Sequence, residues 1–245
     1  MLQEDRFLKI REILESMGSV TIADLQKRLG LSESTVRRDL EEMDERGLIT
    51  KVRGGAIAKA LSVLTTDVLL EKRMELNLES KKRIAEYAAS LIVPGDLVFL
   101  DAGSTTLCMT DFITEKNAVY VTNGVEHGRN LVRHGFRTFI IGGALKPETG
   151  ACVGEEAVAN IEKYNFTKGF FGSNGVTKKN GYTTPEMREA MLKKKAMEHS
   201  KERFVLADES KVGKISSICF GDFGNSTLLT TAKRKDFKDI NVVNL

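Results

Sequence analysis

Small and polar residues follow an apolar segment near the middle of the sequence and suit the binding of an anion. Leu97–Leu100 is strongly apolar and leads into Asp101–Thr106, which has the sequence DAGSTT. Glycine lets the backbone approach a ligand closely, and hydroxyl groups beside the first amides of a helix donate further hydrogen bonds. This combination suits a phosphate group, although an ordinary capped helix start has the same pattern.

Similar residues follow four other strand-like segments. They lie at Thr122–Gly124, Gly142–Gly143, Ser173–Gly175 and Asp208–Lys211. Because ligands of open α/β sheets bind outside the carboxyl ends of the strands, these five ends predict one shared pocket. For Asp208 and Lys211, a surface ion pair explains the residue types equally well.

A second group of residues, near the amino terminus, suits the recognition of DNA. The segment Ser32–Leu40 has the sequence SESTVRRDL. As a helix it buries Val36, Leu40 and Met43 and exposes the polar residues between them. An exposed arginine can donate two hydrogen bonds to guanine, and serine or threonine can reach bases or phosphates. A solvated helix in a generic bundle is the alternative.

The elements around this segment predict a winged helix-turn-helix. Apolar spacing indicates a helix over residues 3–17. Thr21, with Asp24 as capping-box partner, begins a second helix, and Ser32 caps a third that runs to about Arg46. A strand over Leu48–Arg53 and a turn at Gly54-Gly55 form the wing.

Strands and helices alternate in the remainder of the chain, which predicts an α/β domain with a mainly parallel sheet. We expect domain boundaries at 1–57 for the DNA-binding domain, 58–77 for a linker or connecting helix, and 78–245 for the larger domain. The predicted strands are 97–101, 119–122, 139–141, 169–171, 203–207 and 218–220, and the predicted helices are 79–92, from 105, 125–134 and near 185–200.

The composition favours a folded cytoplasmic protein. The chain has 245 residues, of which 41% are hydrophobic and 29% charged, and no apolar run is long enough to cross a membrane. The amino terminus is charged and unlike a signal peptide. The three cysteines lie far apart, which argues against disulfides and zinc. No nucleotide-binding motif occurs, so we expect no cofactor. His127 and His134 are interpreted as surface histidines, and no metal site is expected.

The amino-terminal motifs resemble those of the DeoR family of bacterial transcriptional regulators. The resemblance is carried by Ser32–Leu40, by Gly47-Leu48-Ile49 and by Val52–Ala56, with Arg53 where the family usually has histidine. It implies an operator-binding domain, usually of a repressor. The expected DNA-binding residues are Ser34, Thr35, Arg37, Arg38, Lys51 and Arg53.

The larger domain also resembles the DeoR sensor domain, whose fold is similar to the ribose-5-phosphate isomerase type. Matching segments are Asp101–Thr106, Thr122–Gly124, Ile141–Gly143 and Leu206–Lys211. Family members generally respond to phosphorylated sugars, so the resemblance implies that Ser104, Thr105 and Thr106 hold a phosphate. The complete set of expected effector-binding residues is Asp101, Gly103, Ser104, Thr105, Thr106, Thr122, Asn123, Gly142, Gly143, Asn174, Asp208 and Lys211.

The alternative function is a phosphosugar isomerase fused to a DNA-binding domain. Isomerases of this fold carry an acidic cluster, whereas the corresponding segment Phe171–Gly175 has no carboxylate. Glu186 and Glu189 are nearby and are interpreted as part of a solvated helix face. We therefore predict no catalytic residues. An isomerase assay with pentose and hexose phosphates separates the two functions.

The combined prediction is a repressor of a carbohydrate-use operon, controlled by a phosphorylated sugar. Its partners are double-stranded operator DNA and the sugar effector. Gly181–Glu186 resembles regulators of fructose use, which makes fructose 1-phosphate the first candidate. One winged domain makes few base contacts, so a homodimer or homotetramer is expected on repeated half-sites.

Overall fold

The computed structural model describes residues 2–17, 19–58, 63–64, 69–232 and 241–245. The chain divides into two compact units, Met1–Ser62 and Val63–Leu245. None of the described helices is both long and apolar enough to span a membrane.

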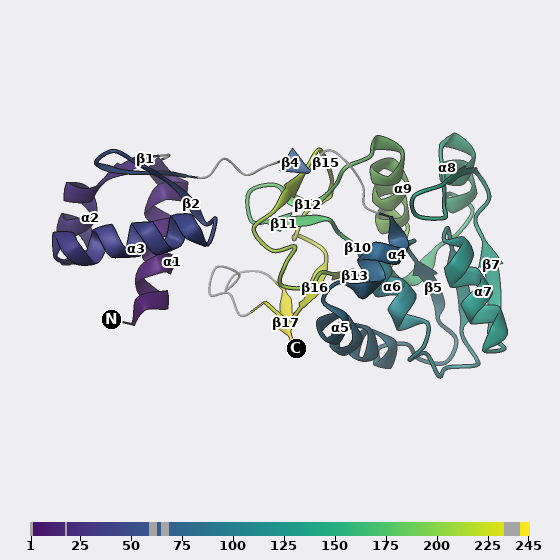
Figure 1. Ribbon diagram of the computed structural model, residues 1–245. Coiled ribbons are helices and arrows are strands. Elements are labelled where there is room, and N and C mark those ends of the chain that lie inside the picture. The colour runs from purple at the N-terminus through teal and green to yellow at the C-terminus, as the bar shows by residue number, and fades with distance from the viewer. Residues whose placement is uncertain (1, 18, 59–62, 65–68, 233–240) are drawn as a thin grey trace. The chain divides into compact units, whose positions relative to one another are not determined.

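Three helices and a small antiparallel sheet form the first unit (Figure 1). Val36, Leu40 and Met43 are fully buried together with Phe7 and Leu25. The polar residues between them are thereby turned outward, as the helical period predicts. The elements are α1 (Gln3–Met17), β1 (Ser19–Thr21), α2 (Ile22–Leu29), α3 (Glu33–Glu45), β2 (Ile49–Val52) and β3 (Gly55–Ala58), with strand order β1-β3-β2.

Hydroxyl caps fix the starts of α2 and α3 where the sequence predicts them. The Thr21 hydroxyl accepts a hydrogen bond from the Asp24 N–H at 3.1 Å. The Ser32 hydroxyl accepts one from the Thr35 N–H at 3.3 Å. Each cap satisfies an amide that has no carbonyl partner inside its helix.

The wing differs from the prediction by one residue. Val52 pairs with Gly55, so the turn consists of Arg53 and Gly54, and Gly54 has a φ of +87°. Gly55 is the first residue of β3, where β1 passes so close that a Cβ would lie 2.2 Å from the Val20 carbonyl oxygen. Strand β1 was not predicted, because a three-residue strand has almost no periodic pattern.

The second unit contains a seven-stranded sheet in which all neighbouring strands are parallel, which confirms the predicted α/β class (Figure 1). From β5, the chain adds β6 and β7 on one side and the later strands on the other. The direction of winding therefore changes between β5 and β10. In spatial order the strands are β17 (Val242–Asn244), β16 (Thr227–Thr230), β13 (Ser200–Leu206), β10 (Phe166–Gly172), β5 (Leu97–Leu100), β6 (Val119–Thr122) and β7 (Arg137–Ile140).

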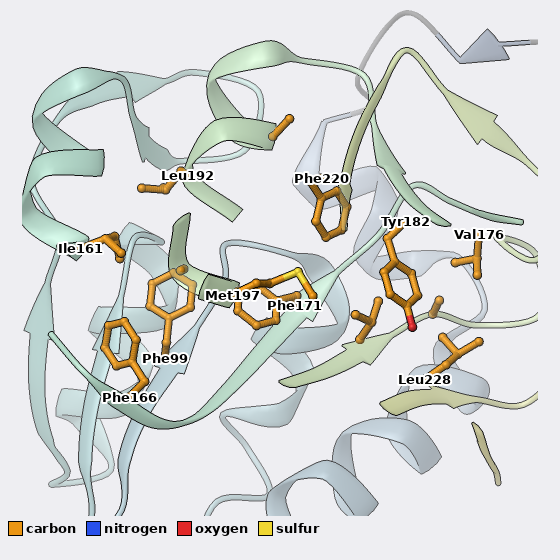
Figure 2. Packing of buried hydrophobic residues seen from close by; sticks show 14 of the residues in the cluster. Phe99, Ile161, Phe166, Phe171, Val176, Tyr182, Leu192, Met197, Phe220 and Leu228 are labelled. Carbon is orange, nitrogen blue, oxygen red and sulfur yellow. The ribbon is translucent and has the colours of Figure 1, made fainter. Parts of the chain in front are cut away.

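Helices cover both faces of this sheet because alternate strand residues point to opposite sides. Leu100 belongs to the apolar cluster that contains α5 (Leu78–Ser90), α6 (Ser104–Met109) and α7 (Val125–Arg133). Its neighbour Phe99 belongs to the cluster on the other face, with α8 (Glu155–Ile161) and α9 (Met187–Glu198). Figure 2 shows Phe99, Phe166 and Ile161 in this second cluster.

Shorter elements surround the sheet. The strand predicted over residues 218–220 is present as β15, but it belongs to an antiparallel sheet and not to the parallel one. Helix α4 (Leu70–Glu75) lies in the segment predicted to connect the domains. The remaining strands are β11 (Gly175–Thr177), β12 (Gly181–Thr184) and β15 (Ile218–Gly221) in one sheet, β8 (Ala144–Lys146) with β9 (Ala151–Val153), and β4 (Val63–Leu64) with β14 (Ile215–Ser216).

Candidate functional site

The exposed side of α3 and the wing bring the six predicted DNA-binding residues into one small unit. Ser34, Arg37 and Arg38 are exposed on α3, whereas Thr35 is half-buried, and its hydroxyl lies 2.8 Å from that of Ser32. Arg53 is exposed in the hairpin turn. The unit therefore presents a polar helix surface and a basic turn.

Nearby carboxylates hold two of these cations. Arg37 forms an ion pair with Glu33 at 2.6 Å, and Lys51 forms one with Glu41 at 2.7 Å. Within the described part of the chain, no ion pair to Arg38 occurs. Exposed ion pairs contribute little stability, so these cations can exchange a carboxylate for a phosphate at small cost.

A buried ion pair that the sequence analysis missed fixes α3 against α1. The Arg6 guanidinium donates to both carboxylate oxygens of Asp39, at 2.5 and 2.8 Å. Asp39 is completely buried, on the side of α3 opposite the exposed arginines. Two parallel hydrogen bonds define one geometry, so this pair sets the orientation of the helix.

A pocket lies in the second unit at the carboxyl ends of the three central strands. Its lining includes residues that follow β5, β10 and β13, and Arg73 of α4 and Lys193 of α9 add cationic groups. The place is the point where the direction of winding changes, at which open parallel sheets bind ligands. The lining residues are Arg73, Ala102, Gly103, Ser104, Thr105, Gly172, Ser173, Asn174, Glu189, Lys193, Leu206, Ala207, Asp208 and Lys211.

Six of the twelve predicted effector residues line this pocket: Gly103, Ser104, Thr105, Asn174, Asp208 and Lys211. Asp208 is 1% exposed, which excludes a surface ion pair for this carboxylate. Its Oδ1 atom accepts hydrogen bonds from the Ser210 N–H and the Asn77 side chain. The other six residues are absent from the lining among the residues that the structure describes.

Three of the six predicted residues that do not line the pocket hold the backbone beside it in place. Asp101 is buried, forms an ion pair with Lys193, and accepts a hydrogen bond from the Gly172 N–H at 3.0 Å. The Asn123 side chain accepts a hydrogen bond from the Ala102 N–H at 3.1 Å. The Thr106 hydroxyl accepts one from the Gly103 N–H at 3.0 Å. These contacts fix the loop that follows β5.

The remaining three lie at the ends of β6 and β7. Thr122 is buried and accepts a hydrogen bond from the Gly124 N–H. Gly142 and Gly143 connect β7 to β8, and a Cβ on Gly143 would lie 2.7 Å from the Val153 carbonyl oxygen. Close packing explains this glycine. The prediction that five strand ends share one pocket thus holds for the three central strands only.

Two charged residues of α9 that line the pocket, Glu189 and Lys193, were not among the predicted effector-binding residues. Glu189 was interpreted as solvated, but it is buried, and it forms an ion pair with Lys146 at 3.1 Å. Its carboxylate also accepts a hydrogen bond from Thr184. Glu186 instead caps α9 by accepting hydrogen bonds from the Arg188 and Glu189 amides. Glu189 and Lys193 are one helical turn apart, so the spacing alone indicates a shared face without indicating burial.

His127 was predicted to be a surface histidine, but it is buried, with 1% of its surface exposed. His134 is exposed as predicted. The Nε2 atom of His127 lies 3.0 Å from the Gly103 carbonyl oxygen and 3.1 Å from the Thr106 hydroxyl. Burial lowers the pKa of His127 to about 4, so the ring is neutral at pH 7. A carbonyl oxygen can only accept, which places the proton on Nε2.

This buried imidazole predicts a pH dependence of stability. The ordinary pKa is 6.5, so between pH 6.5 and about pH 4 the unfolded chain binds more protons than the folded chain. Stability then rises with pH across this window. From pH 7 to pH 5 we expect the free energy of unfolding to fall by about 2 kcal/mol through His127. Urea titrations of wild type and His127→Gln measure it, and equal pH slopes for both proteins contradict the assignment.

Two family models match the chain. The model of the DeoR-like helix-turn-helix domain matches residues 6–60, and that of the DeoR C-terminal sensor domain matches residues 76–233. The chain belongs to the DeoR family. Its two units thus correspond to a DNA-binding and a sensor domain, and the prediction of a DNA-binding transcriptional regulator is confirmed.

Curated relatives agree with this assignment. The chain is 43% identical to the uncharacterized HTH-type transcriptional regulator FruR of Bacillus subtilis, over 94% of this chain and 92% of that protein. It is 31% identical to the lactose phosphotransferase system repressor of Streptococcus mutans, over 97% and 95% of the two chains. Among solved structures, ribose 5-phosphate isomerase A of Methanocaldococcus jannaschii aligns over 56% of each chain with 17% identity and a TM-score of 0.42.

Proposed function

We propose that this DeoR-family protein is a repressor of a carbohydrate-use operon, released or engaged by a phosphorylated sugar. Residues 1–57 bind operator DNA, residues 58–77 connect, and residues 78–245 bind the effector. Ser34, Thr35, Arg37 and Arg38 contact the major groove, and Lys51 and Arg53 contact the backbone or minor groove. Five of these six side chains are exposed on α3 and the wing, and the half-buried Thr35 lies among them, which supports the assignment.

Arg38 gives the first test of this surface. Arg38→Ala removes a side chain placed to meet a base edge, so operator affinity falls by about 1–3 kcal/mol and specificity relaxes at one position. Lys51→Ala, at a proposed phosphate contact, weakens operator and random DNA alike. Gel-shift titrations on both DNAs measure the two effects, with Lys9→Ala on α1 as control for the lost charge. Unchanged operator affinity of Arg38→Ala removes this residue from the interface.

The observation that carries the effector proposal is the pocket at the change of winding direction. There the hydroxyl-bearing residues Ser104 and Thr105 share the lining with Arg73, Lys193 and Lys211. Hydroxyl donors and cations suit a phosphate group. Asn174, Asp208 and Glu189 are groups that hydrogen-bond sugar hydroxyls. Together they favour a polar ligand with an anionic end and a hydroxylated body.

Fructose 1-phosphate is our first candidate because the chain is similar to FruR and carries the Gly181–Glu186 segment. A thermal-shift panel tests it, since a ligand bound only by the folded state raises the melting temperature. The panel contains fructose 1-phosphate, fructose 6-phosphate, glucose 6-phosphate and ribose 5-phosphate, with unphosphorylated fructose as control. A shift from no member of the panel contradicts the effector proposal.

The protein acts in the cytoplasm as a homodimer or homotetramer on repeated half-sites, because one winged unit reads only a short sequence.

It binds the sugar phosphate without converting it. Lys146, Thr149 and Thr184 surround the Glu189 carboxylate, which supports a structural and binding role over that of a free base. Turnover of a sugar phosphate would establish the isomerase alternative.

A further inference from the structure

The segment that follows the first unit is attached to the pocket at two places. The first attachment is strand β4, whose Val63 and Leu64 pair in parallel with Ile215 and Ser216 of β14. Strand β14 begins four residues after Lys211, which lines the pocket. The Lys211 carbonyl and the Gly213 amide bond to Val176 of the neighbouring small sheet, so the intervening turn is itself fixed.

The second attachment is the corner between α4 and α5. Asn77 has a φ of +52°, and its side-chain amide donates hydrogen bonds to Asp208 Oδ1 and to the Ser210 hydroxyl, both at 3.0 Å. Asp208 lines the pocket. The corner is thus bonded to the turn 208–211 that forms one wall of the pocket.

A buried lysine closes the end of α4 onto this corner. The Lys81 ammonium donates hydrogen bonds to the carbonyl oxygens of Arg73 and Leu76, at the last turn of α4. Lys81 is 2% exposed and does not line the pocket. At the other end of α4, the Leu70 amide donates to the Glu148 carbonyl at 2.9 Å. A six-residue helix is not stable alone, so its position depends on these contacts.

Arg73, between the two ends of α4, lines the same pocket as Asp208 and Lys211. We propose that residues 63–77 report effector binding to the DNA-binding unit, with Arg73 contacting the anionic end of the effector and Asn77 joining α4 to the turn 208–211. This inference rests on the proposed effector function. A ligand held by Arg73 and by that turn binds one arrangement of the two walls more tightly than others, and this difference shifts the arrangement of the segment leading from the DNA-binding unit.

Asn77→Gly tests the connection without replacing a residue that lines the pocket. Glycine keeps the positive φ, and the substitution removes only the hydrogen bonds to Asp208 and Ser210. The probe is the panel sugar phosphate that stabilises the wild-type chain most. Calorimetry gives its dissociation constant, and fluorescence anisotropy gives operator affinity with and without it. We expect the ratio of the two operator affinities to fall about fivefold or more, since each of the two lost hydrogen bonds contributes up to about that factor, with binding of the sugar phosphate changed less.

Lys81→Met is the second variant, because it keeps the aliphatic stem and removes the donors that hold the end of α4. Lys82→Met is its control, since Lys82 is exposed and pairs only with Glu79 among the described residues. Asn225→Gly in an exposed turn is the control for Asn77→Gly. We expect Lys81→Met to reduce the ratio while both controls retain the wild-type ratio.

The outcomes separate this inference from the function on which it rests. If the wild-type chain binds no sugar phosphate of the panel, the effector proposal fails and the inference with it. If the wild-type chain binds and responds, but Asn77→Gly and Lys81→Met keep the full ratio, the effector proposal stands and the role of residues 63–77 is wrong.

Discussion

Thr105→Asp abolishes the response to the sugar phosphate, and its affinity falls by about 100-fold or more. Thr105 lines the pocket and is 6% exposed. A carboxylate in this position faces the phosphate, and like charges in a desolvated contact cost several kcal/mol. Thr105 is the second residue of α6, where the helix start favours negative charge, so we expect the variant to fold. Calorimetry measures the affinity for the sugar phosphate, and operator titrations with and without it measure the response.

Thr105→Val is the matched variant, because it removes the hydroxyl without adding charge. We expect it to lose about fivefold in affinity, as for one neutral hydrogen bond. Operator binding in the absence of the sugar is expected to be unchanged in both variants, since the substitution lies in the other unit. A normal response in Thr105→Asp moves the anion site away from the loop after β5.

Asp101→Asn lowers the free energy of unfolding of the second unit by about 3–5 kcal/mol. It leaves the Lys193 ammonium, which is 7% exposed, without its carboxylate. Among the described residues, the acceptor that remains for the Lys193 ammonium is the Gly172 carbonyl oxygen at 3.2 Å. A buried charge that loses its partner is costly, whereas a buried pair as a whole is nearly neutral.

A double variant separates this explanation from simple damage to the core. In Asp101→Asn/Lys193→Met both charges are removed, so the loss of stability is expected to be smaller than in Asp101→Asn alone. Urea unfolding of the two single variants and the double variant provides the cycle. Additive losses contradict the ion-pair explanation.

Local sequence patterns predicted much of the first unit. Val36, Leu40 and Met43 repeat at helical spacing and are all buried, and Thr21 and Ser32 cap the helices that they precede. These features depend on neighbours within four residues, which sequence reasoning captures. The Arg6–Asp39 pair spans 33 positions and left no such pattern.

The pocket was predicted in part for the same physical reason. The polar residues at a strand end are visible in the local sequence, so Ser104, Thr105 and Asp208 were predicted as pocket residues. Which strands lie together at the change of winding direction depends on the sheet order, and this order excluded the ends of β6 and β7. Arg73 and Lys193 lie in helices and not at the strand ends that the sequence pattern identifies. Only the fold brings them to the pocket.

The most direct test of a sugar-controlled DNA-binding regulator is operator binding in the presence of the effector. The operator is the sequence that the full chain selects from a random duplex pool. Fluorescence anisotropy then measures affinity for it with the panel sugar phosphates and with unphosphorylated fructose. We predict nanomolar binding, as specific regulators have at physiological salt, that at least one sugar phosphate changes fivefold or more and fructose does not. No selected sequence, or the same affinity with every sugar phosphate, contradicts the account.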